Sequence, residues 1–231
     1  MENLTVLYED NQIVVVIKPQ NVPTQADESG DLDLLSMVKA YVKEKYNKEG
    51  EAFVGLIHRL DRPTGGVMVF ARNSKSAKRL SEQFATHSVE KIYYAVTNDV
   101  VKTKMEKLTN YLKKDEKENL VKVCPMSEKG AKKAELVYTV LEDNGENSLL
   151  EVKILTGRSH QIRVQLANAG HSLVGDVKYG KAHGKTSALG LWAGRLSFEH
   201  PTTKEHMVFL ACPNEKVSPW NKFDMSKYLS R

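Results

Sequence analysis

The sequence predicts an α+β fold, with a mixed, mostly antiparallel sheet and a few flanking helices. Short apolar segments with a strand-like pattern recur along the 231 residues, and most gaps between them are too short for helical crossovers. Three segments instead carry apolar residues at helical spacing. With 41% hydrophobic residues, the chain can bury a sizeable core.

The first half of the chain contains two predicted strands and two predicted helices. Residues 13–17, IVVVI, form a β-branched run that stops at Lys18-Pro19, which indicates a buried strand entering a turn. Residues 31–46 have the pattern of an amphipathic helix, and residues 66–71 that of a strand. Asn73 or Ser74 can cap the next helix, whose apolar face consists of Ala77, Leu80 and Phe84.

The second half is predicted to be mainly strands. Their ranges are 91–96, 120–123, 134–140, 150–154, 191–198 and 207–211. A short helix is expected over 159–169, with Ile162 and Leu166 on one face and Gly170 at its C-terminal end. We find no linker that would divide the chain, so residues 1–231 are predicted to form a single domain.

The segment 102–119, KTKMEKLTNYLKKDEKEN, is dense in alternating charge and has few apolar anchors. This pattern favours a solvated loop or hairpin tip, and an arm that contacts RNA is the alternative. The sequence leaves both interpretations open.

The overall charge permits a polyanionic partner without requiring one. Lys and Arg total 34 against 29 Asp and Glu, and the pI is near 9.0. Cys124 and Cys212 lie far apart, which suggests neither a disulfide framework nor a zinc site. The N-terminal apolar run is too short for a signal peptide or a membrane span, so we expect a cytoplasmic protein.

Two segments carry candidate chemistry. HRLDRPTGG, residues 58–66, places Asp61 near two arginines at the start of a turn, where an Asp ordinarily satisfies backbone donors. LTGRSHQIRV, residues 155–164, places Arg158 and Arg163 around the start of the predicted helix. If this helix faces the turn, an arginine would keep Asp61 ionised in a partly desolvated pocket.

Two histidines suggest a metal site at first sight. His58 and His160 flank these segments, but no third ligand lies at a suitable spacing. We therefore expect structural histidines and no metal.

These segments, together with KIYYAV, IKPQNVPT and TGRSHQIRVQLANAGHSLVGDVKYG, resemble the RluA-type RNA pseudouridine synthases from about residue 6 to 212. The resemblance implies isomerisation of a uridine in structured ribosomal or transfer RNA, without cofactor or metal, by a protein expected to be a monomer that binds no membrane. In this reaction the base leaves its C1′–N1 bond, turns and rejoins through C5. No S4-type RNA-binding domain is recognisable, and the motifs depart from the family at Thr64-Gly65-Gly66 and Leu191-Trp192-Ala193.

The resemblance also implies roles for three catalytic residues. Asp61 matches the catalytic aspartate, which could attack the sugar, attack the base or remove a sugar proton. Arg163 matches the arginine that pairs with it, with Arg158 as the nearby substitute. Tyr93 matches a tyrosine that packs against the target base, although an ordinary core tyrosine would look the same.

Substrate binding is assigned by the same resemblance. Arg59 matches an arginine that fills the space left by the flipped nucleotide, where a lone arginine would otherwise be a surface ion pair. Leu60 and Ile162 would be apolar walls of the pocket, but core packing explains them equally well. With Arg158, these residues complete the predicted substrate-binding set.

Two other functions compete with this prediction. A non-catalytic RNA-binding module could keep the fold, but it would have no evident use for Asp61. A glycoside or nucleoside hydrolase normally needs a second carboxylate, and neither HRLDRPTGG nor TGRSHQIR contains one.

Overall fold

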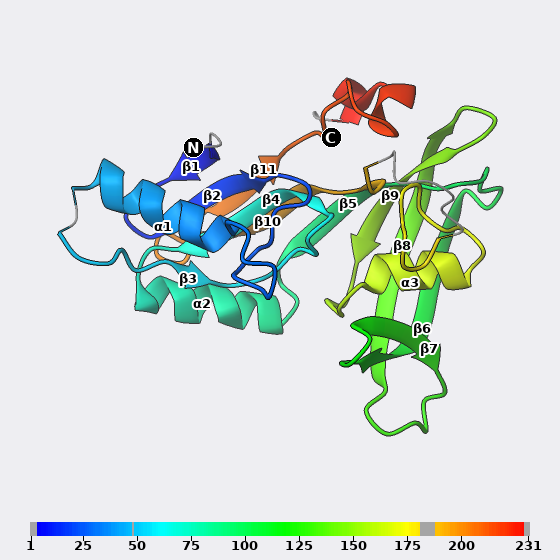
Figure 1. Ribbon diagram of the computed structural model, residues 1–231, viewed down its shortest axis with the longest axis horizontal. Helices are drawn as coiled ribbons and strands as arrows, with labels where there is room; N and C mark the ends of the chain where they lie inside the picture. The colour runs from blue at the N-terminus through cyan, green and yellow to red at the C-terminus, as the bar shows by residue number, and fades with distance from the viewer. Residues whose placement is uncertain (1–3, 48, 181–187, 229–231) are drawn as a thin grey trace. The chain divides into compact units, whose positions relative to one another are not determined.

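The computed structural model describes residues 4–47, 49–180 and 188–228 (Figure 1). The chain divides into two compact units: residues 1–90 with 193–211, called unit 1, and residues 91–192 with 212–231, called unit 2. The first two boundaries fall inside strands, at 90/91 and 192/193, and the third falls at 211/212, directly after a strand. That residues 1–231 form a single domain stays a prediction.

Unit 1 is built on antiparallel strand pairs. The strands are β1 (Thr5–Glu9), β2 (Ile13–Lys18), β3 (Gly55–Leu56), β4 (Gly65–Ala71), β10 (Leu191–Glu199) and β11 (His206–Leu210). Their order is β1-β2-β4-β10, with β3 beside β4 and β11 beside β10. Every residue of β4 is buried, which confirms the predicted strand.

Two helices lie along these strands, as Figure 1 shows. Helix α1 (Leu34–Lys45) begins three residues later than the pattern suggested, because the Asp33 side chain accepts from the Ser36 N–H and caps it there. Helix α2 (Ser74–Ala85) is capped by Asn73 in the same way, as expected. The predicted helices are confirmed, with their starts decided by caps.

Unit 2 is a second antiparallel arrangement with one helix. Its strands are β5 (Glu90–Val96), β6 (Met105–Asp115), β7 (Leu120–Cys124), β8 (Lys132–Asp143) and β9 (Ser148–Ile154), in the order β5-β9-β8-β6-β7. Helix α3 (Gln161–Asn168) packs on β6 and β7. Two 3₁₀ helices, η1 (Trp220–Lys222) and η2 (Met225–Tyr228), follow near the C-terminus.

The charged segment is more ordered than a solvated loop. Residues 105–115 form strand β6, which pairs with β7 and β8 and makes a hairpin with β7. Leu108 and Leu112 are buried at an even spacing along this strand, while most of its other residues are exposed. Two buried leucines therefore suffice to hold the strand. Strands β1 and β3 and the two 3₁₀ helices were likewise not predicted from the sequence.

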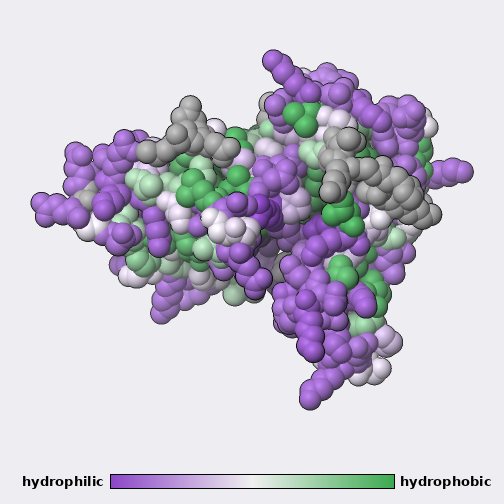
Figure 2. All heavy atoms as spheres, viewed as in Figure 1, coloured by the Kyte–Doolittle hydropathy of each residue, from purple (hydrophilic) through white to green (hydrophobic). Residues whose placement is uncertain are grey.

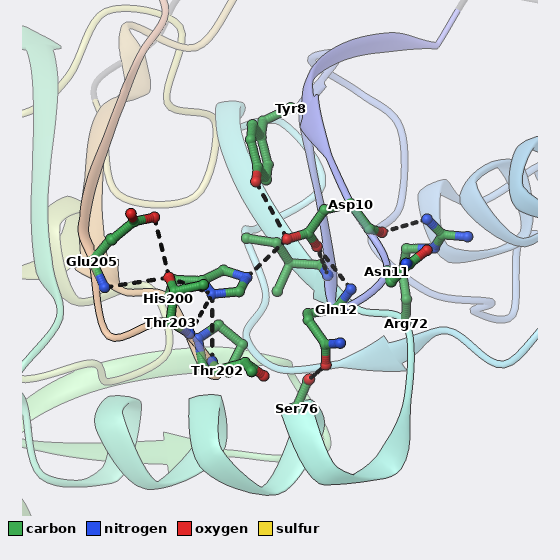
Figure 3. Close-up of polar contacts among 12 residues, drawn as sticks. Tyr8, Asp10, Asn11, Gln12, Arg72, Ser76, His200, Thr202, Thr203 and Glu205 are labelled. Carbon is green, nitrogen blue, oxygen red and sulfur yellow. Dashed lines mark hydrogen bonds and ion pairs between the residues drawn. The ribbon is translucent and has the colours of Figure 1, made fainter.

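A polar cluster in unit 1 ties the β1–β2 turn to the β10–β11 turn (Figure 3). Asp10 Oδ2 lies 2.9 Å from His200 Nε2, and Asp10 Oδ1 accepts from the N–H groups of Gln12 and Ile13. His200 Nδ1 accepts from the Thr203 N–H at 3.0 Å. Ile13 pairs with Ala71 at the end of β4, whereas Asp61 precedes the start of that strand. The cluster therefore lies about one strand length, roughly 20 Å, from Asp61, and we assign it to stability.

The α+β class with a mostly antiparallel sheet is confirmed. All strand pairs with a described register are antiparallel. Within the described residues, no helix is long and apolar enough to cross a membrane.

Candidate active site

Asp61 lies in the connection between β3 and β4 of unit 1, and it is half-buried. The Thr64 N–H donates to the Asp61 carbonyl at 2.9 Å, which closes a turn directly after the aspartate. The chain then enters the fully buried strand β4. One side of the loop is thereby anchored to the core of unit 1.

Lys18, at the end of β2, binds the backbone of this loop through its ammonium group. Its side chain is fully buried, and its ammonium donates to the carbonyls of Pro19 at 2.9 Å, Val22 at 2.6 Å and Arg62 at 3.0 Å. Three acceptors for three N–H donors satisfy the charged form of the amine. Lys18 therefore fixes the backbone one residue beyond Asp61.

Two further side chains of the same segment bind the loop. Thr24 Oγ1 donates to the Leu60 carbonyl at 2.8 Å and accepts from the Leu60 N–H at 3.3 Å. Gln20 Nε2 donates to the Pro63 carbonyl at 3.0 Å. Together with Lys18, these bonds hold the residues on both sides of Asp61, which gives the early IKPQNVPT segment a definite structural role.

The electrostatics of the loop follow from this arrangement. Burial lowers the pKa of Lys18 to about 7, and the neighbouring Asp61 carboxylate opposes that shift. Arg62 is exposed and donates from Nε to the Asn21 carbonyl at 3.1 Å, while its other nitrogens contact Ser29 and Asp31. Asp61 thus lies beside two cations whose positions are set by hydrogen bonds.

Gly66 is the glycine at which β4 comes close to another strand. Its φ is +130°, and a Cβ there would lie 2.3 Å from the Ala193 carbonyl oxygen. No side chain fits at this distance. The glycine therefore lets β4 approach Ala193 of β10 directly after the Asp61 loop.

Arg59 and Leu60 are placed differently by the same loop. Arg59 is exposed at the surface of this loop. Leu60 is buried, with 7% of its surface exposed, so core packing accounts for it. Their predicted roles in binding RNA stay predictions.

His58 is structural, as expected. Its Nε2 accepts from the Val69 N–H at 3.2 Å, and its ring stacks on Phe84 with centroids 4.6 Å apart. Within the described residues, no three His, Cys, Asp or Glu side chains are grouped to hold a metal ion. The expectation of a cofactor-free reaction is not tested by this and stays a prediction.

The carboxylate that binds Arg163, that of Asp176, was not among the residues predicted from the sequence. In unit 2, Arg163 donates from Nε to Asp176 Oδ2 at 2.8 Å and from Nη2 to Asp176 Oδ1 at 2.7 Å, and both side chains are buried. Burial pushes the pKa of Asp176 up, but the Arg163 guanidinium holds it below its usual value overall. The available signal was a lone acid between Gly175 and Gly180. The predicted pairing of Arg163 with Asp61 stays a prediction.

The remaining predicted residues also lie in unit 2. Tyr93 is in β5 opposite Val152 and is 9% exposed. Ile162 is buried in α3, and Arg158 is exposed just before it, with its Nε donating to the Lys133 carbonyl at 3.0 Å. Lys91, two residues before Tyr93 on the same side of β5, has its pKa lowered by burial. Tyr93 and Ile162 are equally compatible with core packing.

A half-exposed carboxylate on a turn that hydrogen bonds hold in place has the position expected of a catalytic group. Comparison with known proteins identifies the class. Residues 12–168 match the model of the RNA pseudouridylate synthase family. The chain belongs to this family, and it is an RNA pseudouridine synthase.

Individual relatives agree with this assignment. The chain is 32% identical over 209 residues to the uncharacterised RNA pseudouridine synthase YhcT of Bacillus subtilis, covering 89% of this chain and 67% of that protein. It is 31% identical over 193 residues to the ribosomal large subunit pseudouridine synthase D of Borreliella burgdorferi, covering 81% of this chain and 58% of that protein. The solved human RNA pseudouridylate synthase domain containing 4 has the same fold, with a TM-score of 0.77 at 23% identity over 91% of this chain and 89% of that one.

Proposed function

We propose that this protein converts a specific uridine of structured ribosomal RNA to pseudouridine, with Asp61 as the catalytic carboxylate and without a cofactor. The name of the Borreliella burgdorferi relative supports ribosomal over transfer RNA. The observation that carries the catalytic role is the fixed turn: Lys18, Gln20 and Thr24 bind the residues around Asp61 and leave its side chain half exposed. A positioned, solvent-accessible carboxylate can act as nucleophile or base once the nucleotide leaves its stack.

The proposed reaction divides the work between several residues. Arg59 occupies the space of the flipped uridine, Tyr93 packs against the base, and Arg163 holds Asp61 ionised. Leu60 and Ile162 form apolar walls, and Arg158 contacts the RNA. The bond between C1′ and N1 breaks and a bond between C1′ and C5 forms, so C5 loses its hydrogen as a proton and N1 gains a proton. The reaction is therefore balanced without a redox partner or an external group.

The test of the proposed function is tritium release from ribosomal RNA labelled at C5 of uridine. The wild-type protein should release tritium to water and yield pseudouridine in the RNA digest. Asp61→Asn should abolish release while the RNA affinity stays within about threefold, because the amide keeps the shape and loses both the charge and the basicity. The matched control is Asp143→Asn, an exposed carboxylate at the end of β8; it accepts a hydrogen bond from the Gly145 N–H, which an amide oxygen can accept as well.

Each other outcome points to a different protein function. RNA binding without tritium release by the wild type would identify a non-catalytic RNA-binding module. Free uracil would identify a hydrolase. Conversion of transfer RNA but not ribosomal RNA would correct the substrate and keep the reaction. Turnover by Asp61→Asn near the wild-type rate would refute the role of Asp61.

We further propose that the β6–β7 hairpin contacts RNA phosphates. Residues 102–119 contain six lysines and four acids, and Figure 2 shows the lower part of unit 2 as mostly hydrophilic on the visible face. Lys113 and Lys114 are exposed and paired with Glu128 and Glu116, and such surface pairs are weak enough to yield to phosphate.

The salt dependence of RNA binding tests the hairpin. Replacing Lys113 and Lys114 by alanine should weaken binding and reduce the slope of log affinity against log salt by about one for each phosphate that is no longer neutralised. The control replaces Lys75 and Lys78, two exposed lysines of α2, and should leave the slope unchanged. An unchanged slope in the hairpin variant would exclude the contact.

A further inference from the structure

We propose that Asp176 is the positioning residue of the reaction: it sets the plane and direction of the Arg163 guanidinium, and Tyr179 holds the assembly in place. The inference rests on the proposed function, because it gives Arg163 its task. It concerns residues within unit 2 alone, and nothing in the sequence motifs assigned a role to Asp176.

The contact between the two side chains determines an orientation as well as a charge. The two carboxylate oxygens of Asp176 each accept one hydrogen bond from the guanidinium, from Nε at 2.8 Å and from Nη2 at 2.7 Å. A bidentate pair of planar groups allows little rotation of either. The Nη1 edge of Arg163 therefore points in a fixed direction.

Asp176 is itself held by the backbone of its own turn. Its Oδ1 accepts from the N–H groups of Lys178 at 3.0 Å and Tyr179 at 3.1 Å, and the Gly180 N–H donates to the Asp176 carbonyl at 2.9 Å. A Cβ at Gly180 would lie 2.5 Å from that carbonyl oxygen, so the closed turn requires glycine. The carboxylate is therefore preorganised before it meets Arg163.

Tyr179 links this turn to two other elements. Its ring lies with its centroid 5.2 Å from Arg163 Cζ, and its hydroxyl accepts from the Val121 N–H of β7 at 2.8 Å. The same hydroxyl is 2.7 Å from His160 Nδ1, at the left-handed residue that starts α3 with φ of 50°. One hydroxyl thus fixes the start of the helix that carries Arg163 and the ring beside its guanidinium.

Stability alone gives a weak reason for such a pair. Burying two charges costs about as much as their attraction returns, and apolar residues of similar size would often serve as well. Arg163 is buried, is held by both oxygens of Asp176 and lies beside the ring of Tyr179. Such an arrangement is expected when the direction of a cation matters for the chemistry.

A double-mutant cycle on single-turnover tritium release separates positioning from structure. Asp176→Asn should lower the rate constant by about 10- to 100-fold with RNA affinity within about threefold of wild type. In an Arg163→Ala background the same change should have no further effect within about threefold, because Asp176 acts through that arginine. A merely structural role would lower stability in both backgrounds and would leave the rate constant of the folded molecules unchanged.

Two further variants complete the experiment. Asp176→Glu keeps the charge but moves the carboxylate, and it should lower the rate constant by about tenfold; it replaces the asparagine variant in the cycle if that one does not fold. Lys178→Ala is the matched control, since its side chain bonds the Asn119 carbonyl and its backbone N–H is kept. Control and wild type should agree.

The possible failures are distinguishable. A wild-type protein that forms no pseudouridine would refute the proposed function before the cycle begins. An active wild type with Asp176 variants within about threefold of it, or with losses that add fully to that of Arg163→Ala, would overturn the positioning role alone.

Discussion

Replacing Lys18 by methionine should destabilise unit 1 far more than the loss of one surface charge would. The methionine side chain would fill a similar volume, but the three carbonyls of Pro19, Val22 and Arg62 would lose the ammonium that now donates to them at 2.6 to 3.0 Å. At about 1–3 kcal/mol for each unsatisfied acceptor, the gross cost is roughly 6 kcal/mol. Removing a buried ammonium returns part of this, so we expect a net loss of about 3 kcal/mol.

Urea unfolding followed by circular dichroism measures this loss, from the midpoint and slope of each curve. The matched control is Lys45→Met in α1, whose ammonium pairs with Glu9 while its side chain is 47% exposed. Because exposed pairs contribute little, this control should cost less than about 1 kcal/mol. Equal losses in the two variants would refute the role assigned to the buried lysine.

The same pair of proteins tests the charge of Lys18. Burial lowers its pKa in the folded protein to about 7, against 10.5 for an ordinary lysine. Between these two values the unfolded chain binds more protons than the folded one, so the free energy of unfolding should rise with pH over that range. Lys18→Met should lack this part of the rise. An identical pH dependence in both proteins would show that Lys18 stays charged when folded.

Three other predictions follow from the site. The activity lost in Arg59→Ala should be partly restored when the target uridine is unpaired, because flipping then costs less of the usual few kcal/mol, whereas the activity lost in Arg163→Ala should not. Single-turnover conversion of paired and unpaired RNA measures this, and equal recovery of both variants, or of neither, would show that the two roles are wrongly divided. Tritium release should persist in EDTA, and a loss restored by added zinc or magnesium would contradict a cofactor-free reaction. Gly66→Ala should lower the free energy of unfolding by about 3 kcal/mol or more, because its Cβ meets Ala193; a wild-type melting curve would refute the close approach.

The elements with strong local patterns could be predicted from sequence. The buried run of β2, the strand after HRLD and the amphipathic helix α1 each repeat apolar residues at one period over several residues. Strand β6 was not predicted because Leu108 and Leu112 are the only two of its residues that are buried. Their burial depends on β7, β8 and α3, which pack around this part of the strand. Periodicity reports burial only where one face carries enough residues.

The chemistry of the site divides in the same way. Asp61, its neighbouring arginines and the TGRSHQIR segment were recognisable by residue type and order along the chain, as was the family to which they point. What the sequence could not indicate was which groups hold them: Lys18 bonds a carbonyl 44 positions away, and Asp176 reaches back 13 positions to Arg163. These partners are chosen by distance in space and by the need to satisfy buried charges, and both exist only once the strands and turns have come together.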